Sequence, residues 1–243
     1  MRKTTMLILV AFLPVFVIGQ QILPGSSHLE NKWIQNSTYK MKWFMMISDT
    51  ATKELGEIIT TIKKQDQTVI VSQQVKINGM PDPWMDSTVA DLKSFAPIYH
   101  SSSNRQRTMQ LQFKGPLVSG SYTNNMKKTT ENISDTATGS FFDSNIYPNL
   151  LAWLPLKPGF KADIPVYNWN SVSEHGVVNV KVEDVKEQNY LLNNGQTVPV
   201  FVISVKDEIS KSSSTYFIGK SDRKTYEIRT SAGPRRMLMK LVE

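Results

Sequence analysis

Residues 56–77 read GEIITTIKKQDQTVIVSQQVKI, and this stretch decides the fold class. Ile58, Thr60 and Ile62 alternate with a second row of mostly polar side chains, which is the two-residue period of a β-strand with one buried face. Residues 68–77 repeat the pattern, and the polar residues 64–67 between the two runs are typical of a hairpin connection. The stretch therefore predicts two consecutive antiparallel strands.

The same period extends in both directions along the chain. On the N-terminal side, residues 39–47 place Tyr39, Met41, Trp43 and Met45 in one row. Turn-forming residues, such as Asn78-Gly79, follow many of the runs. Short strands at regular spacing favour an antiparallel sheet that curls or closes over a series of βαβ units. Further strands are expected at residues 84–92, 94–101, 108–113, 116–125, 127–133, 177–186, 198–206, 213–219, 224–230 and 236–242.

One segment, residues 146–154, breaks this rhythm. Leu150, Trp153 and Leu154 fall at helical spacing; Pro148 suits an early helical position and Pro155 should end the helix. The proline-bearing residues 154–165 then separate an N-terminal from a C-terminal group of strands. We expect a mainly β fold, a curved and nearly closed antiparallel sheet (a half-barrel) with one short helix in or over its concave face.

The first residues have the pattern of an export signal. Arg2 and Lys3 precede an apolar run over residues 6–18, and Gly19 provides a small residue before polar Gln20. A retained membrane anchor is the alternative, but it needs about 20 apolar residues, and this run is shorter and contains a proline. We expect a signal peptide at residues 1–19, cleaved after Gly19, and a single strand-rich domain over residues 20–243.

Composition narrows the class of protein further. The 243 residues include no cysteine, so disulfides, thiol nucleophiles and a lipidated cysteine anchor are excluded. The net charge is +7, two units of which come from Arg2 and Lys3. The basic pairs are scattered, whereas a nucleic-acid site needs a concentrated basic face. We expect an exported, untethered protein of Gram-negative type, periplasmic rather than secreted, that binds no nucleic acid; the scattered pairs are Lys63-Lys64, Lys127-Lys128, Arg223-Lys224 and Arg235-Arg236.

Motifs for catalysis, metals and cofactors do not occur in the sequence. His28, His100 and His175 are far apart, form neither HExxH nor a His-x-His pair, and are expected to be exposed loop or strand-end residues. A Gly-x-Ser-x-Gly elbow and a glycine-rich phosphate loop are also missing. We therefore predict no catalytic residue, no metal ion and no cofactor.

Large apolar side chains are more informative, because the chain has 5 Trp and 11 Met. On alternating strand positions they can line a hydrophobic pocket, where the flexible thioether of Met adapts to irregular ligands. The alternative is an ordinary filled core, in which the same residues pack against each other and the helix. The residues considered as a pocket lining are Trp43, Met45, Trp84, Phe95, Phe113, Trp153 and Tyr167.

Several short motifs follow one another in an order that resembles a known family. Over residues 56–242 the chain resembles the exported DUF3108 family of Bacteroidetes, which is similar in architecture to the lipoprotein carriers of the envelope. The resemblance implies a curved, nearly closed antiparallel sheet with a short helix in or over its concave face, the architecture in which lipoprotein-sorting proteins shelter acyl chains. It does not imply that activity for this chain, and the family has no agreed biochemical function. The motifs are Trp84-Met85-Asp86-Ser87-Thr88, Phe95-Ala96-Pro97, Leu111-Gln112-Phe113, Val118-Ser119-Gly120-Ser121-Tyr122, LAWLPLKPG at residues 151–159, Tyr216-Phe217-Ile218 and Arg223-Lys224.

These observations favour a non-enzymatic envelope protein that binds a lipid, an acyl chain or another hydrophobic ligand in the concavity of the sheet. Transient contact with a membrane or an envelope protein is compatible with this function. One alternative is a protein–protein interaction module with a filled core and no ligand cavity. A hydrolase is the third reading, and it requires His100 or His175 to meet a carboxylate and a serine within hydrogen-bond reach.

Overall fold

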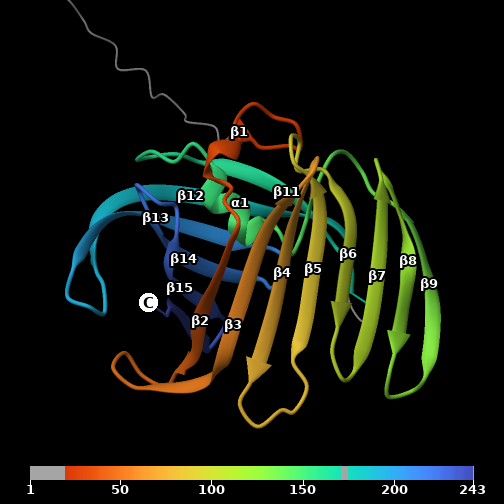
Figure 1. The fold of residues 1–243 in the computed structure, drawn as a ribbon, viewed down its shortest axis with the longest axis horizontal. Helices are drawn as coiled ribbons and strands as arrows, with labels where there is room; N and C mark the ends of the chain where they lie inside the picture. The colour runs from red at the N-terminus through yellow and green to blue at the C-terminus, as the bar shows by residue number, and fades with distance from the viewer. Residues whose placement is uncertain (1–19, 171–174, 243) are drawn as a thin grey trace, which may run out of the picture.

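The computed structural model describes residues 20–170 and 175–242, which form one large β-sheet and one α-helix (Figure 1). No helix in these two segments is long and apolar enough to cross a membrane. The elements are β1 (Gln20–Gln21), the 3₁₀ helix η1 (Asn31–Trp33), β2 (Ser37–Met46), β3 (Thr52–Gln65), β4 (Thr68–Ile77), β5 (Trp84–Asp91), β6 (Pro97–Ser103), β7 (Arg107–Lys114), β8 (Leu117–Asn124), β9 (Thr129–Thr136), β10 (Phe142–Asp143), α1 (Tyr147–Trp153), β11 (Ala162–Asn168), β12 (Gly176–Leu191), β13 (Thr197–Asp207), β14 (Ser212–Gly219), β15 (Thr225–Ala232) and β16 (Arg235–Leu241).

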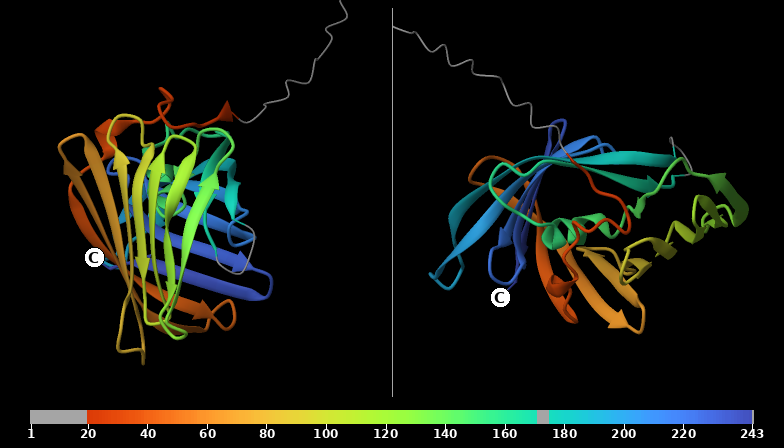
Figure 2. Two further views of the ribbon diagram at one scale, coloured as in Figure 1. Left: turned by 90° about the vertical axis from the view of Figure 1, so that its right-hand side faces the viewer. Right: turned by 90° about the horizontal axis from the view of Figure 1, so that it is seen from above.

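Two antiparallel meanders make up the sheet. Strands β2 to β9 pair in chain order, as do β11 to β16, and the antiparallel pairing of β16 with β2 joins the two groups. In Figure 1 the first group stands upright in front and β11–β15 run across behind it. Figure 2 shows, from above, how the two groups diverge from their junction to enclose a concave side.

The sheet stops short of closure. The strand order ends in β9 on one side, and on the other side the short strands β1 and β10 pair along the outer edge of β11; β9 pairs with none of these three strands. Instead, the Tyr167 hydroxyl on β11 donates a 2.8 Å hydrogen bond to the Asp135 carboxylate on β9. Phe113 and Phe141 pack against the Tyr167 ring, with ring centroids 5.8 Å and 5.3 Å away. Side chains therefore close the gap that the strands leave open.

Helix α1 lies inside the concave side, between the two groups of strands (Figures 1 and 2). Pro148 occupies its first turn, and its Leu150, Leu151 and Trp153 are buried. The Trp153 ring stacks on Phe95 with centroids 5.5 Å apart. Each fully buried side chain of this size contributes roughly 1.5–3 kcal/mol through the hydrophobic effect. The helix thus fills much of the space that the curved sheet encloses.

The predicted fold class is confirmed: a curved antiparallel sheet with one short helix over its concave face. Two details differ. The pairings of β1 and β10 with β11 are parallel. Strand β6 begins at Pro97 rather than at residue 94, because buried Phe95 lies in a turn with a φ of 61°.

Strand β11 was missed by the sequence analysis, which placed its first residues in a proline-bearing separator. Proline lacks the N–H that a central strand needs, so it is usually found at a sheet edge. Pro165 fits here because its neighbours on β11 divide the pairing on that side: Ala162 and Asp163 pair with β1, and Val166 and Tyr167 with β10. The expected signal peptide and its cleavage site after Gly19 lie outside the described residues.

Candidate functional site

A cavity of about 640 Å³ opens beside α1, and we call it the α1 cavity. Its apolar wall comes from segments that are far apart in the sequence: Trp33 of η1, Tyr39 of β2, Ile62 of β3, and Ala152 and Trp153 of α1. The remaining lining residues are Gln35, Ser37, Thr38, Lys40, Asn149, Leu192, Asn194, Asp222, Arg223, Lys224, Thr225, Tyr226, Leu241 and Val242.

Strand register puts the apolar wall together. Ser37 pairs with Ile62 and Tyr39 with Thr60, so their side chains share the concave face at the start of β2. The Tyr39 hydroxyl donates a 3.0 Å hydrogen bond to Asn149 Oδ1 on α1. Burial raises the pKa of Tyr39, so its phenol stays neutral at physiological pH. This contact ties the helix to the strand along one side of the cavity.

A buried cation, Arg223, lies in the wall at the turn between β14 and β15. Its φ of 56° puts the backbone in the left-handed region, and its N–H donates to the Gly219 carbonyl at 3.1 Å. The guanidinium carbon lies 4.7 Å from the Trp33 ring centroid and 5.0 Å from that of Phe201. Only 7% of the side chain is exposed, and burial lowers the pKa of Arg223 although Glu30 acts against this.

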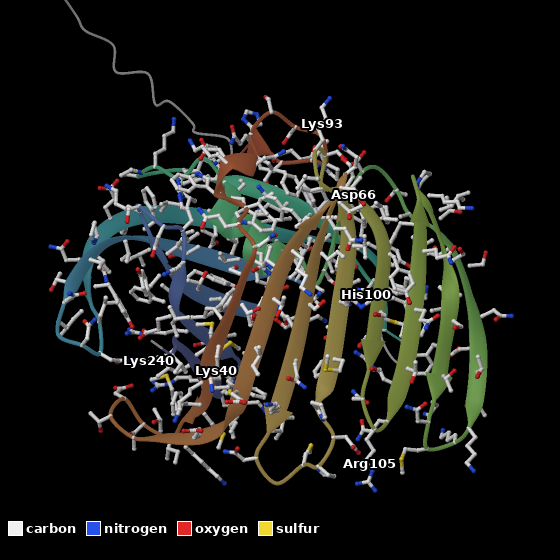
Figure 3. All side chains as sticks on the ribbon, viewed as in Figure 1. Lys40, Asp66, Lys93, His100, Arg105 and Lys240 are labelled. Atoms are coloured by element: carbon white, nitrogen blue, oxygen red, sulfur yellow. The ribbon has the colours of Figure 1, made fainter. Side chains whose placement is uncertain are left out.

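A second polar cluster lies farther along the concave face, around His100. Figure 3 shows His100 midway along the upright strands, between the turns that carry Asp66 and Lys93 at one end and Arg105 at the other. Its Nδ1 lies 3.0 Å from the Asp143 carboxylate, which also accepts a hydrogen bond from Thr88. The prediction that His100 is exposed was wrong, since β6 turns it inward and leaves it 5% exposed.

Two neighbouring carboxylates determine the direction in which the pKa of His100 shifts. Burial lowers the pKa of His100, but the carboxylates of Asp143 and Asp86 more than offset this, so the pKa is raised above its ordinary value. His100 Nε2 is 3.8 Å from Asp86 Oδ1 and has no hydrogen-bond partner among the described residues. Burial also raises the pKa of Asp86.

The His100 cluster meets one of the two conditions for a hydrolase. His100 has its carboxylate, Asp143, but within residues 20–170 and 175–242 no serine hydroxyl is hydrogen-bonded to Nε2. The Ser102 hydroxyl, which β6 carries nearby, instead accepts hydrogen bonds from Trp84 Nε1 at 3.1 Å and Arg107 Nη2 at 3.3 Å. Over residues 20–170 and 175–242, no three His, Asp or Glu side chains are grouped to hold a metal ion.

The seven residues considered as a pocket lining do not share one cavity. Phe95 stacks on Trp153, which alone of the seven lines the α1 cavity. Phe113 and Tyr167 pack together near the gap between β9 and β11. The other three lie elsewhere: Trp84 borders a hollow beside His100, and Trp43 and Met45 are half-buried on β2 beyond the α1 cavity.

The sequence did not indicate Trp33 or Arg223 as a site residue, although both line the α1 cavity. They are 190 positions apart, and although Arg223-Lys224 is one of the motifs that resemble the family, neither residue carries a motif for ligand binding. The pairing of β16 with β2 brings their ends of the chain together.

Residues 38–240 match the model of a protein family, described as protein of unknown function (DUF3108). The match runs from β2 to β16 and includes Arg223 and His100. No curated protein matches the chain.

Proposed function

The chain belongs to the DUF3108 family, and we propose that this member is an exported, non-enzymatic protein that binds an apolar chain, such as a lipid acyl chain, in the α1 cavity. The observation that carries the proposal is the cavity itself, an opening of about 640 Å³ walled by Trp33, Tyr39, Ile62 and Trp153. Small-molecule sites typically enclose roughly 300–1,000 Å³ and are lined mainly by apolar and aromatic groups.

Burial of the chain is the whole mechanism. Each methylene group removed from water contributes about 0.8 kcal/mol, so eight of them contribute roughly 6 kcal/mol before the entropic cost of association. The aromatic rings of Trp33 and Trp153 supply flat apolar surface for this contact. Binding of this kind forms no covalent bond.

The groups that line the α1 cavity support binding rather than catalysis. Tyr39 has a raised pKa and holds its proton, Asn149 is a neutral amide, and Arg223 is a cation that lies against the rings of Trp33 and Phe201. The hydrolase alternative centres on His100 instead, whose Nε2 has no hydrogen-bond partner in the described part of the chain.

A protein–protein interaction module, the other alternative, would be favoured by a broad apolar patch on the convex face. The most exposed large apolar side chains of the described residues lie at turns and strand ends, and two of them, Met80 and Met126, line one hollow together with Trp84. These most exposed side chains are Ile47, Met80, Leu117, Met126 and Leu191.

Filling the cavity tests the proposal. Ser37 is exposed and lines the cavity, so Ser37→Trp places a large ring in it without disturbing the core. With the neutral fluorescent probe N-phenyl-1-naphthylamine, we expect saturable binding to the wild type and at least about tenfold weaker binding to Ser37→Trp.

Ser134→Trp is the matched control. Ser134 is exposed on β9, on the face of the strand opposite to that of buried Ile133. It should bind the probe as the wild type does. A wild type that does not bind the probe, or a Ser37→Trp variant that binds it unchanged, would overturn the proposal.

A further inference from the structure

We propose that the α1 cavity selects apolar chains that end in an anionic oxygen group, a carboxylate or a phosphate, and that Arg223 is the residue that recognises this group. The inference rests on the proposed function, since it assumes that the cavity holds an apolar chain. It adds the chemical class of the ligand and the residue that sets specificity.

Arg223 carries buried hydrogen-bond donors that nothing satisfies. Its Nε and Nη1 have no partner among the described residues, although the side chain is more than nine-tenths buried. Leaving a charged group buried and unpaired is costly, so such groups are normally paired or bound to a ligand. The guanidinium is a planar fork whose N–H groups match the two oxygens of a carboxylate or phosphate.

The nearest acidic group does not fill this role. Glu30 Oε2 is 3.8 Å from Arg223 Nη2, which is beyond hydrogen-bond distance. The Glu30 carboxylate is already engaged by Lys32 Nζ at 2.9 Å and by Trp33 Nε1 at 2.6 Å. Glu30 therefore holds the Trp33 ring in place and leaves the edge of the guanidinium free.

Two aromatic rings fix the guanidinium in position. The Trp33 and Phe201 rings lie 4.7 Å and 5.0 Å from its central carbon and attract the cation. Contacts of this kind do not use the N–H donors of the guanidinium. A ligand would therefore meet a cation that is already oriented.

The other polar groups of the cavity agree with an anionic ligand. Asn149 Nδ2 is a second buried donor without a partner among the described residues, and it lines the same wall. Lys40 and Lys224 also line the cavity, and they pair with Glu57 at 3.3 Å and Asp222 at 3.9 Å. The Asp222 carboxylate accepts hydrogen bonds from the Tyr226 hydroxyl at 2.8 Å and from the Lys224 N–H at 3.1 Å.

Ligands that share one chain and differ only in the head group test this inference. Dodecanoate, dodecyl phosphate and dodecanol would each be titrated to displace N-phenyl-1-naphthylamine at pH 7.5. We expect the wild type to bind at least one of the two anions about tenfold more tightly than dodecanol, as one charge-assisted hydrogen-bonded pair provides. Whichever anion binds more tightly identifies the source as a fatty acid or a phospholipid head group.

Variants at position 223 assign the preference to the side chain. Arg223→Gln should lose the preference while its affinity for dodecanol changes less than about twofold, and Arg223→Lys should keep part of the preference because its charge remains. Arg235→Gln, which removes an exposed positive charge outside the α1 cavity, should keep the full preference.

The outcomes separate the two proposals. Equal binding of all three ligands by the wild type, or a full preference in Arg223→Gln, would overturn the role of Arg223 and leave the cavity as a site for apolar chains. Absence of any binding would overturn the proposed function. The wild-type comparison alone decides the matter if Arg223→Gln does not fold.

Discussion

His100 is a buried histidine that lies between two carboxylates. It faces Asp143 at 3.0 Å and Asp86 at 3.8 Å, and Arg107 lies on the same side as an opposing positive charge. The net effect raises its pKa, so the folded protein binds the proton more tightly than the unfolded chain does. The stabilisation is complete below the unfolded pKa of about 6.5 and is lost as pH rises through the higher folded pKa.

Stability should therefore fall as pH rises from about 6.5 through the higher folded pKa of this residue. Replacing it by His100→Gln should abolish that part of the pH dependence and cost roughly 1–3 kcal/mol at pH 6, where a buried charged hydrogen bond is lost. Urea unfolding at several pH values measures both effects. His175→Gln, at an exposed position, is the control, and equal pH dependence in wild type and His100→Gln would contradict the prediction.

The sequence could not indicate the His100 cluster or the surroundings of Arg223, because the residues that meet there are far apart in the chain. His100 and Asp143 are 43 positions apart and meet because β10 and β6 approach each other inside the sheet. Neither residue carries a local motif, and the alternation of β6 only shows that His100 and Ser102 share a face. Long-range packing decided that this face is the buried one.

At the level of elements, alternation predicted most strands because it records which face of each strand is buried. The helix was predicted from Leu150, Trp153 and the flanking prolines, and α1 covers residues 147–153. Strand β11 was not predicted, because a proline such as Pro165 is unfavourable in a central strand. Pro165 is tolerated in β11 because the pairing on that side is interrupted between β1 and β10. Such an arrangement is visible only once the strands are paired.

The gap between β9 and β11 gives a prediction at the same scale. Tyr167→Phe keeps the aromatic packing but removes the hydrogen bond to Asp135, so we expect a loss of about 0.5–1.5 kcal/mol in unfolding free energy. Amide hydrogen exchange should accelerate in β9 and not in β3, which lies far from the gap. A variant that leaves β9 exchange unchanged would show that this contact does not hold the end strands together.

The whole molecule contains both a filled core and an open cavity. Helix α1 and its partners fill the middle of the concave side, with Leu151, Leu154 and Ile164 fully buried. Beside this core the α1 cavity remains open, and the central claim is that an apolar chain enters it. Three of the seven residues considered as a lining, Phe95, Phe113 and Tyr167, belong to the core instead, because alternation identifies inward side chains but not the spaces between them.

Quenching of tryptophan fluorescence by a fatty acid brominated at its methyl end tests that claim most directly. Trp33 and Trp153 line the α1 cavity, whereas Trp84 lies elsewhere. We predict strong quenching in the wild type, clearly less in Trp153→Phe, and wild-type quenching in Trp84→Phe. No quenching, or quenching that Trp84→Phe reduces and Trp153→Phe does not, would contradict the account.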